Sequence, residues 1–248
     1  MIKVVATSHA VWSITFSTDG TCIVSSSGDE SVRVWDASTG AELKVLEGHT
    51  DTVQSVAFST DGTHIVSGSS DNSVRVWDAL TEAELKVLKG HTDTVQSIAF
   101  STDGTRIISG SSDNSVWVWD VSTGVELKVL RGHMDTVQSV TFSTDGPHII
   151  SGSSDNSVRV WDVSTGVELK VLRGHMDTVQ SIAFSTDGTC IVSGSEDNSV
   201  RVWDALTGAE LKLLNGHMHI VQSVTFSTDS TVHLTNLCGC GMHQLRLS

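Results

Sequence analysis

Short stretches of alternating polar and apolar residues follow one another along the whole chain. Residues 52–59 (TVQSVAFS) alternate with a period of two, as a half-buried β-strand does. Residues 64–69 and 73–78 predict two further strands, and residues 82–87 predict a fourth. Turn signals such as Asp-Gly separate these stretches, and no stretch combines a helix cap with helical spacing. The pattern therefore predicts short antiparallel strands joined by tight turns.

The same set of four strands recurs with a constant period. Residues 90–131 and 132–173 differ at only six positions, and Gly-His and Trp-Asp pairs each recur every 42 residues. A fixed period in this range is typical of solenoids, arrays and propellers. Four short antiparallel strands in 42 residues are typical of one propeller blade. The Gly-His pairs begin at Gly48, Gly90, Gly132, Gly174 and Gly216, and the Trp-Asp pairs at Trp35, Trp77, Trp119, Trp161 and Trp203.

The repeat combines a Gly-His pair, a tight turn that contains Asp and a Trp-Asp end, all in register. In these features residues 6–227 resemble the WD-repeat β-propeller family, and the near-identical repeats are most similar to those of fungal NLR-like receptor proteins. The resemblance implies an all-β fold, a single β-propeller of about six four-stranded antiparallel blades over residues 1–248. It also implies that the N-terminal strand closes the last blade, which protects exposed strand edges.

The last blade is split between the two ends of the chain. Residues 2–5 look like a fourth strand, and residues 221–229 look like a first strand and turn. In the degenerate C-terminal blade, 216–248, we expect a second strand at 231–237 and a third at 242–248. Alternatively, this tail is the remnant of a longer array of repeats that was truncated or frameshifted. The ring is then open, or it closes between chains.

Charge and composition narrow the classes of partner. The chain has 248 residues and a net charge of −14. We therefore expect no nucleic-acid partner and no binding to an anionic membrane surface, since both need basic patches. The N-terminus does not look like a signal peptide, and no apolar run is long enough to span a bilayer. Four cysteines (Cys22, Cys190, Cys238 and Cys240) are too few for a disulfide framework, so we expect a cytoplasmic protein.

Each repeat also contains Ser, His and Asp, the residue types of a hydrolytic triad. No Gly-x-Ser-x-Gly elbow is present, and each Ser is expected in a strand beside a large Trp. The indole N–H donates, while Ser and His can each accept and donate, so a chain from Trp to Ser to His to Asp is possible. In the WD-repeat family these positions form a structural network, which implies the tetrads His49, Ser67, Asp71 and Trp77; His91, Ser109, Asp113 and Trp119; His133, Ser151, Asp155 and Trp161; and His175, Ser193, Asp197 and Trp203.

The first and last repeats keep only part of this set. The first has Ser25, Asp29 and Trp35, with Thr7 in the strict register of the His and His9 as an alternative. The last keeps His217. We expect no catalytic residues and no enzyme activity.

Two groups of residues raise the question of a metal site. Cys238 and Cys240, with His233 and His243 nearby, are spaced more tightly than in usual zinc sites and are better explained as a Gly-rich turn. The recurring Asp51, Asp93, Asp135 and Asp177 are better explained as solvated loop charges. We therefore expect no metal and no cofactor. The repeat position of Cys22, His64, Arg106, His148 and Cys190 varies freely, which indicates a partly exposed site.

The Gly-His loops and the Asp turns must lie on one face, because the His and the Asp have to meet. Loops on rigid scaffolds carry function, and in the WD-repeat family partners commonly bind on this face. The resemblance places candidate partner-binding residues three and five positions after each His and one before each turn Asp. They are Trp12, Thr52, Gln54, Ser70, Thr94, Gln96, Ser112, Thr136, Gln138, Ser154, Thr178, Gln180, Glu196 and Gln222, with Gly28 in the first blade.

These residues favour a non-catalytic scaffold or recognition module that binds protein partners. The alternative is a propeller with several equivalent sites for a small ligand or a glycan. Binding stoichiometry separates the two. Trp12 is the large aromatic anchor of the face, and Trp117, which replaces an Arg of the other repeats, is either a second anchor or a packing residue.

Overall fold

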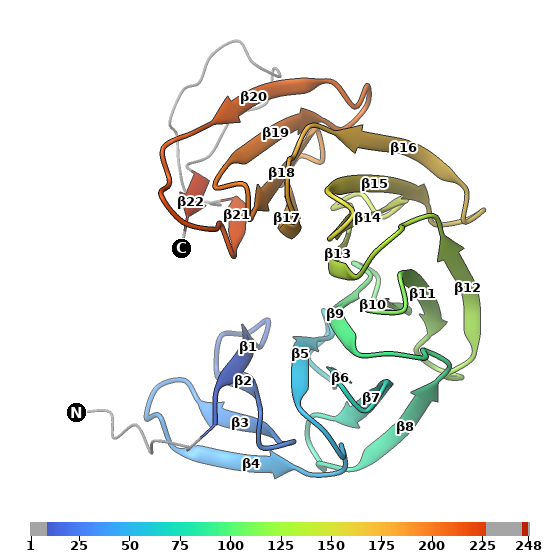
Figure 1. The fold of residues 1–248 in the computed structure, drawn as a ribbon. Helices are drawn as coiled ribbons and strands as arrows, with labels where there is room; N and C mark the ends of the chain where they lie inside the picture. Colours follow the sequence, from blue (N-terminus) through green and yellow to red (C-terminus); the bar gives the residue numbers. More distant parts are fainter. Residues whose placement is uncertain (1–8, 227–244, 248) are drawn as a thin grey trace. The chain divides into compact units, whose positions relative to one another are not determined.

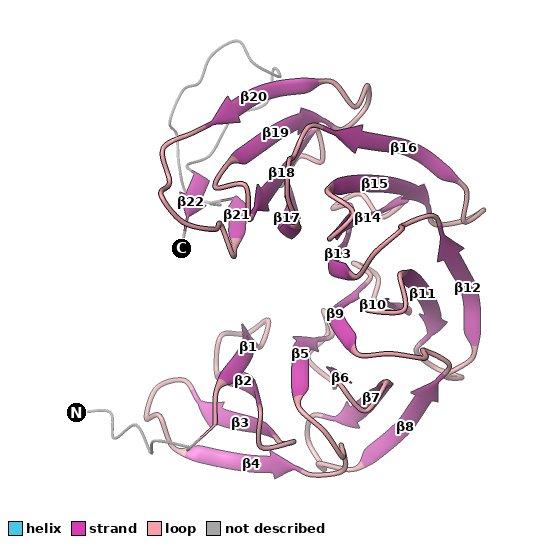
Figure 2. Cartoon of the chain, in the orientation of Figure 1, coloured by secondary structure: helices cyan, strands magenta, loops and turns pink. Residues whose placement is uncertain are grey.

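A computed structural model of the chain describes residues 9–226 and 245–247 (Figure 1). Every regular element in these residues is a β-strand, as Figure 2 shows, and no helix in them is long and apolar enough to cross a membrane. The expected strand at 2–5 and the expected strand at 231–237 lie outside the described residues. The all-β prediction is confirmed.

Five four-stranded antiparallel sheets follow one another along the chain, each in sequence order, and we call them blades 1–5. Blade 1 contains β1 (Val11–Phe16), β2 (Cys22–Ser27), β3 (Val32–Asp36) and β4 (Glu42–Leu46). Blade 2 contains β5 (Val53–Phe58), β6 (His64–Ser69), β7 (Ser73–Asp78) and β8 (Glu84–Lys89). Blade 3 contains β9 (Val95–Phe100), β10 (Arg106–Ser111), β11 (Ser115–Asp120) and β12 (Glu126–Arg131). Blade 4 contains β13 (Val137–Phe142), β14 (His148–Ser153), β15 (Ser157–Asp162) and β16 (Glu168–Arg173). Blade 5 contains β17 (Val179–Phe184), β18 (Cys190–Ser195), β19 (Val200–Asp204) and β20 (Glu210–Leu214).

A β-bulge interrupts the first hairpin of every blade at the same place. In blade 4, Val137 pairs with Ser153 and Ser139 pairs with Gly152, so Gln138 is the extra residue. The same shift skips Gln54, Gln96 and Gln180, and in blade 1 it skips Trp12. A bulge bends a strand and re-aims the side chain at that point. The bulged residue of each blade is therefore one of the predicted face positions.

The chain forms two compact units, each of which packs neighbouring blades together. Of the described residues, those up to Asp113 and Trp117–Lys128 form the first unit, and Asn114–Val116 and those from Val129 onward form the second. In the first unit Val34 and Leu46 of blade 1 pack with Val53 and Trp77 of blade 2. In the second, blades 4 and 5 form the equivalent cluster. The apolar side chains of the repeat thus hold adjacent blades together.

The first strand of blade 1 presents exposed apolar side chains. Val11, Ile14 and Phe16 are 54%, 67% and 59% exposed. Val53 and Val56, the counterparts of Val11 and Ile14 in blade 2, are 0% and 5% exposed because β5 packs against β1 and β2.

The C-terminal segment departs from the expected strand order. β21 (Val224–Phe226) pairs directly with β22 (Leu245–Leu247), antiparallel. The prediction that 242–248 forms a third strand, separated from the first by 231–237, is therefore wrong. Gly239 and Leu245 stand where the repeat has its turn Asp and its Trp, so the tail lacks the residues that fix the repeat's register. The count of six blades and the closure of the ring stay predictions.

Candidate functional site

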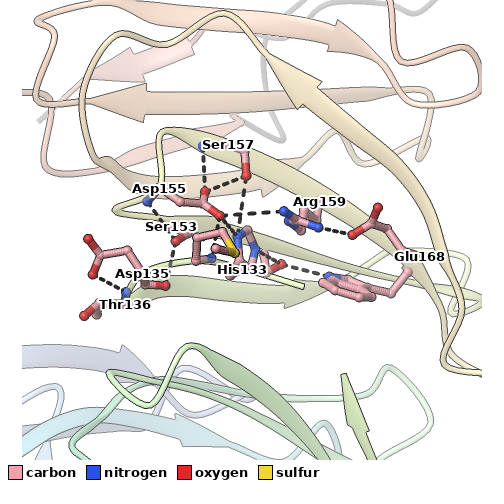
Figure 3. Close-up of polar contacts among 11 residues, drawn as sticks. His133, Asp135, Thr136, Ser153, Asp155, Ser157, Arg159 and Glu168 are labelled. Carbon is pink, nitrogen blue, oxygen red and sulfur yellow. Dashed lines mark hydrogen bonds and ion pairs between the residues drawn. The ribbon is translucent and has the colours of Figure 1, made fainter. Parts of the chain in front are cut away.

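The Ser, His, Asp and Trp of blade 4 meet in one hydrogen-bonded chain (Figure 3). The Trp161 indole Nε1–H donates to Ser151 Oγ over 2.8 Å, and Ser151 Oγ lies 2.7 Å from His133 Nε2. His133 Nδ1 lies 2.9 Å from Asp155 Oδ2. A carboxylate only accepts, so Nδ1 carries the proton, and the Ser151 hydroxyl donates to Nε2. Every polar atom in the chain then has a partner.

Blades 2, 3 and 5 contain the same chain. In all three the Trp-to-Ser distance is 2.9 Å and the Ser-to-His distance is 2.7 Å. The His-to-Asp distances are 2.8, 2.7 and 2.8 Å. The structure thus brings together all four residues of each tetrad named from the sequence.

The turn Asp also ties the Gly-His loop to the turn between the second and third strands. Asp155 Oδ2 accepts from the backbone N–H of Met134 over 3.0 Å, while Oδ1 accepts from the N–H and the hydroxyl of Ser157. In return, the Ser153 hydroxyl donates to the backbone carbonyl of Asp135 over 2.9 Å. Figure 3 shows these contacts between the loop and the turn. The two segments therefore form one rigid edge of the blade, which we call the Gly-His edge.

These contacts set the charge state of the buried groups. Burial by itself would raise the pKa of Asp155, but hydrogen bonds from His133 and Ser157 outweigh it and hold the pKa well below its usual range. The same balance lowers the pKa of Asp71 and of Asp197. Burial lowers the pKa of His175, against the raising effect of its bond to Asp197. The Asp side chains are thus ionised, and His175 favours the neutral imidazole.

We expect the free energy of unfolding to decrease in two steps as the pH is lowered. His175 binds a proton more readily when unfolded, so its contribution is lost as pH falls below about 6.5. The three Asp residues have folded pKa values below the unfolded one, so their contribution is present above about pH 4 and is lost as pH falls further. Urea unfolding at pH 7, 5 and 3 measures this. Equal unfolding midpoints at the three pH values would contradict it.

The geometry does not present a nucleophile to a substrate. Ser67, Ser109, Ser151 and Ser193 are each 0% exposed, and each oxygen is held between an indole and an imidazole. A catalytic Ser needs an accessible hydroxyl beside its base. The arrangement therefore supports a structural role for the tetrads.

Blade 1 keeps the Trp-to-Ser bond of the network. Trp35 Nε1 donates to Ser25 Oγ over 2.8 Å, and Asp29 forms an ion pair with Arg33 at 3.1 Å. His9 is exposed, unlike the buried His49 of blade 2. Thr7 lies outside the described residues. His217 is also exposed, and the segment around it forms no strand.

Blade 3 replaces an ion pair by an aromatic stack. In the other blades an Arg at this position pairs with a Glu of the fourth strand, as Arg33 does with Glu42 at 2.5 Å. Trp117 instead stacks on Trp119, with ring centroids 5.0 Å apart, and lies 4.9 Å from the His91 ring. Only 9% of Trp117 is exposed. The interpretation of Trp117 as an anchor for a binding partner is therefore wrong, because its ring packs against Trp119 and His91 within the blade.

Gly90 is the residue that makes room for this stack. A Cβ on Gly90 would lie 2.1 Å from the Trp117 ring, whereas one on Gly132 would meet the flexible end of Arg159 at 2.7 Å. We expect Gly90→Ala to cost about 1–3 kcal/mol of stability and Gly132→Ala less. In a Trp117→Arg background the cost of Gly90→Ala should fall to that of Gly132→Ala. Urea unfolding of the four variants tests this, and equal costs of Gly90→Ala in both backgrounds would contradict it.

The predicted partner-binding positions come together on the Gly-His edge of each blade. In blade 4 the Ser154 N–H donates to the Thr136 carbonyl over 2.9 Å, and Gln138 Nε2 donates to Ser154 Oγ over 3.0 Å. Thr52, Gln54 and Ser70 make the same two bonds in blade 2, as do Thr94, Gln96 and Ser112 in blade 3. In blade 5, Gln180 bonds to Glu196 at 2.6 Å, and the Glu196 N–H to the Thr178 carbonyl. All these residues are partly exposed, and Gln222 is exposed. Whether a partner binds them stays a prediction.

Sequence reasoning missed the methionines of the Gly-His loops. Met134, Met176 and Met218 are 81%, 81% and 89% exposed, directly after the His. The sequence contains the signal, which is the change from Thr50 and Thr92 in the first two Gly-His loops to Met in the later ones.

The opposite edge contains two hollows at equivalent places in the first unit. One, of about 520 Å³, lies against His64, Thr105 and Asp120, and the other, of about 430 Å³, lies against Cys22, Thr63 and Asp78.

The position that begins each second strand is partly exposed in blades 1–4, as expected. In blade 5 it is not, because Cys190 is 0% exposed.

The candidate metal ligands have other arrangements. Asp51, Asp93, Asp135 and Asp177 each accept a hydrogen bond from the next backbone N–H, at 2.6–2.8 Å. Over residues 9–226 and 245–247, no three His, Cys, Asp or Glu side chains gather as metal ligands would. His233, Cys238, Cys240 and His243 lie outside this part of the chain.

Comparison with known proteins gives the same repeat. Residues 2–36, 40–78, 82–120, 124–162 and 166–204 each match the WD40 family, described as WD domain, G-beta repeat. A probable serine/threonine-protein kinase, PkwA, from Thermomonospora curvata is 44% identical over 52 residues. That match covers 21% of this chain and 7% of the kinase. The five WD40 matches span more than half of the chain, and each contains one Trp-Asp end on the third strand of a four-stranded blade, so the chain belongs to the WD40 repeat family.

Proposed function

We propose that the chain is a non-catalytic protein–protein interaction module whose partners bind the Gly-His edge. WD40 repeats generally mediate protein–protein interaction and scaffolding, and WD40 repeat proteins are generally non-catalytic. The observation that carries the choice of edge is the β-bulge in the first hairpin of all five blades, which places a Gln or Trp at this edge each time. Bulges commonly serve to re-aim side chains at functional sites.

The structural residues and the face residues of each blade differ in burial, which supports this proposal. Buried Ser and His, together with the turn Asp, fix the loop and the turn, while Thr, Gln and Ser between them remain partly exposed. A rigid edge with exposed polar groups loses little conformational entropy when a partner binds. We also propose six blades with the N-terminal strand completing the last one, on the strength of the repeat and of β21.

Two sets of substitutions test the choice of edge. The first changes Gln54, Gln96 and Gln138 to Ala, and the matched control changes Thr63, Thr105 and Thr165, in turns of the opposite edge, to Ala. Each tagged protein is incubated with extract from its source organism, and the recovered proteins are quantified by mass spectrometry. We expect the first set to lose proteins that the control set retains. Equal recovery with both sets would overturn the proposal.

A further inference from the structure

Four of the positions at which blade 1 departs from the other blades lie near one corner of the Gly-His edge. Trp12 stands where the others have Gln, and Gly28 where they have Ser or Glu. Glu30 replaces an Asn, and Glu47 replaces Lys, Arg or Asn. We call these four residues, together with the hollow beside them, the blade 1 corner. The four changes alter both the apolar surface and the charge of this corner.

Trp12 forms an exposed platform on the turn of its own blade. A Cβ on Gly28 would lie 3.5 Å from the Trp12 indole nitrogen, an ordinary van der Waals distance, so the ring lies against the turn. Trp12 is 56% exposed. Its counterparts Gln54 and Gln96 are partly exposed although their blades pack against a preceding blade. The position therefore faces solvent because of the bulge.

A hollow of about 320 Å³ lies beside this turn, lined by acidic and basic groups. Arg33 is paired with Asp29 at 3.1 Å and with Glu42 at 2.5 Å. Glu30 and Glu47 also line the hollow, and neither takes part in an ion pair with another described residue. Within the described part of the chain, these two exposed carboxylates are thus left without a cation.

The other titratable groups around the hollow do not neutralise Glu30 and Glu47. His49 uses both ring nitrogens, on Asp71 and on Ser67. Arg75, which also lies against Gly48, forms an ion pair with Glu84. An acidic partner would be repelled from this corner, and a basic one would be attracted, the more so because the whole chain carries a net charge of −14.

We propose that the blade 1 corner binds a basic segment of a partner protein. One Lys or Arg side chain enters the hollow beside Glu30 and Glu47, and a neighbouring Arg or aliphatic side chain lies on the Trp12 ring. An indole face attracts cations and also buries apolar groups. This inference rests on the proposed function, because it names the partner chemistry for one part of the Gly-His edge.

A synthetic peptide tests the inference. The probe is acetyl-Ala-Arg-Leu-Lys-Arg-Ala-amide, and its acidic counterpart has Glu in place of Arg and Lys. Binding to the full chain is followed by the NMR shift of the Trp12 indole N–H, assigned from Trp12→Gln. We expect the basic peptide to shift this resonance and to bind about tenfold more tightly than the acidic one. No shift at 1 mM basic peptide would overturn the proposal.

Variants that restore the residues of the other blades separate this corner from general electrostatics. Glu47→Lys and Glu30→Asn place at each position a residue that another blade already carries, so the fold is expected to be retained, as circular dichroism checks. We expect Glu47→Lys to weaken binding about tenfold. Glu126→Lys, an exposed site on β12 with the same change in charge, should weaken it less than twofold. Equal weakening by the two would overturn the proposal.

The proposed function and this inference fail separately. If Trp12→Gln with Glu30→Asn retains every protein that the Gln54, Gln96 and Gln138 variant loses, the interaction module stands and the basic-segment proposal is overturned. If neither variant loses a protein, both proposals are overturned.

Discussion

Trp161→Ala is expected to lower the free energy of unfolding by about 3–5 kcal/mol. The indole is 1% exposed, its ring centroid lies 6.2 Å from that of His133, and its Nε1–H donates to Ser151 over 2.8 Å. Truncation leaves a cavity the size of an indole and removes a donor from a hydroxyl that has no access to water. Urea unfolding followed by circular dichroism at 218 nm measures the loss.

Two other substitutions separate packing from hydrogen bonding at this position. Trp161→Phe keeps most of the apolar volume and loses the donor, so it should cost less than Trp161→Ala, about 1–3 kcal/mol. Trp12→Ala, at a side chain 56% exposed, should change stability by no more than about 0.5 kcal/mol. A Trp161→Ala protein as stable as Trp12→Ala would contradict the buried role of Trp161.

Asp155→Ala is expected to cost at least about 3 kcal/mol. The carboxylate accepts from His133 Nδ1, from the N–H of Met134 and from Ser157, and its loss leaves these donors without an acceptor. The side chain of Asp155 is 9% exposed, so water replaces it poorly. The Gly-His loop and the turn are then no longer tied through this group.

Asp135→Ala is the matched control in the same loop. Asp135 is exposed and accepts a hydrogen bond from the adjacent Thr136 N–H at 2.7 Å. Its loss should cost no more than about 1 kcal/mol. Equal costs for the two Asp residues, measured by urea unfolding at pH 7, would show that the turn Asp does not organise the edge.

The tetrads could be predicted from the sequence because their spacing and their chemistry agree. Ser151 and Trp161 flank a turn, which places them on neighbouring strands, and a donor-only indole needs an acceptor. The resemblance to the WD-repeat family adds His133 and Asp155 to the same set, and the period of 42 transfers the set to the other repeats. The hydrogen-bonding capacity of these residue types allows one chain from Trp to Ser to His to Asp, and the resemblance to the WD-repeat family is what identified the four positions as its members.

Other features depend on packing that a linear pattern does not encode. The bulges at Gln54 and Gln138 need the pairing register, which alternation alone leaves open by one residue. The direction of the Trp117 ring depends on Gly90, which lies far from it in the sequence. The C-terminal tail was misassigned because no residue there fixes a register. The charge of the blade 1 corner appears only when Glu30 and Glu47, from different turns, are seen to line one hollow.

The seven tryptophans of the chain allow one measurement to test whether the tetrads hold the blades together. Hydrogen exchange of the indole Nε1–H groups, followed by NMR at pH 7, reports on each ring separately. We predict slow exchange at Trp77, Trp119, Trp161 and Trp203, fast exchange at Trp12, and faster exchange at Trp161 in Ser151→Ala. Exchange at the four tetrad indoles as fast as at Trp12 would contradict it.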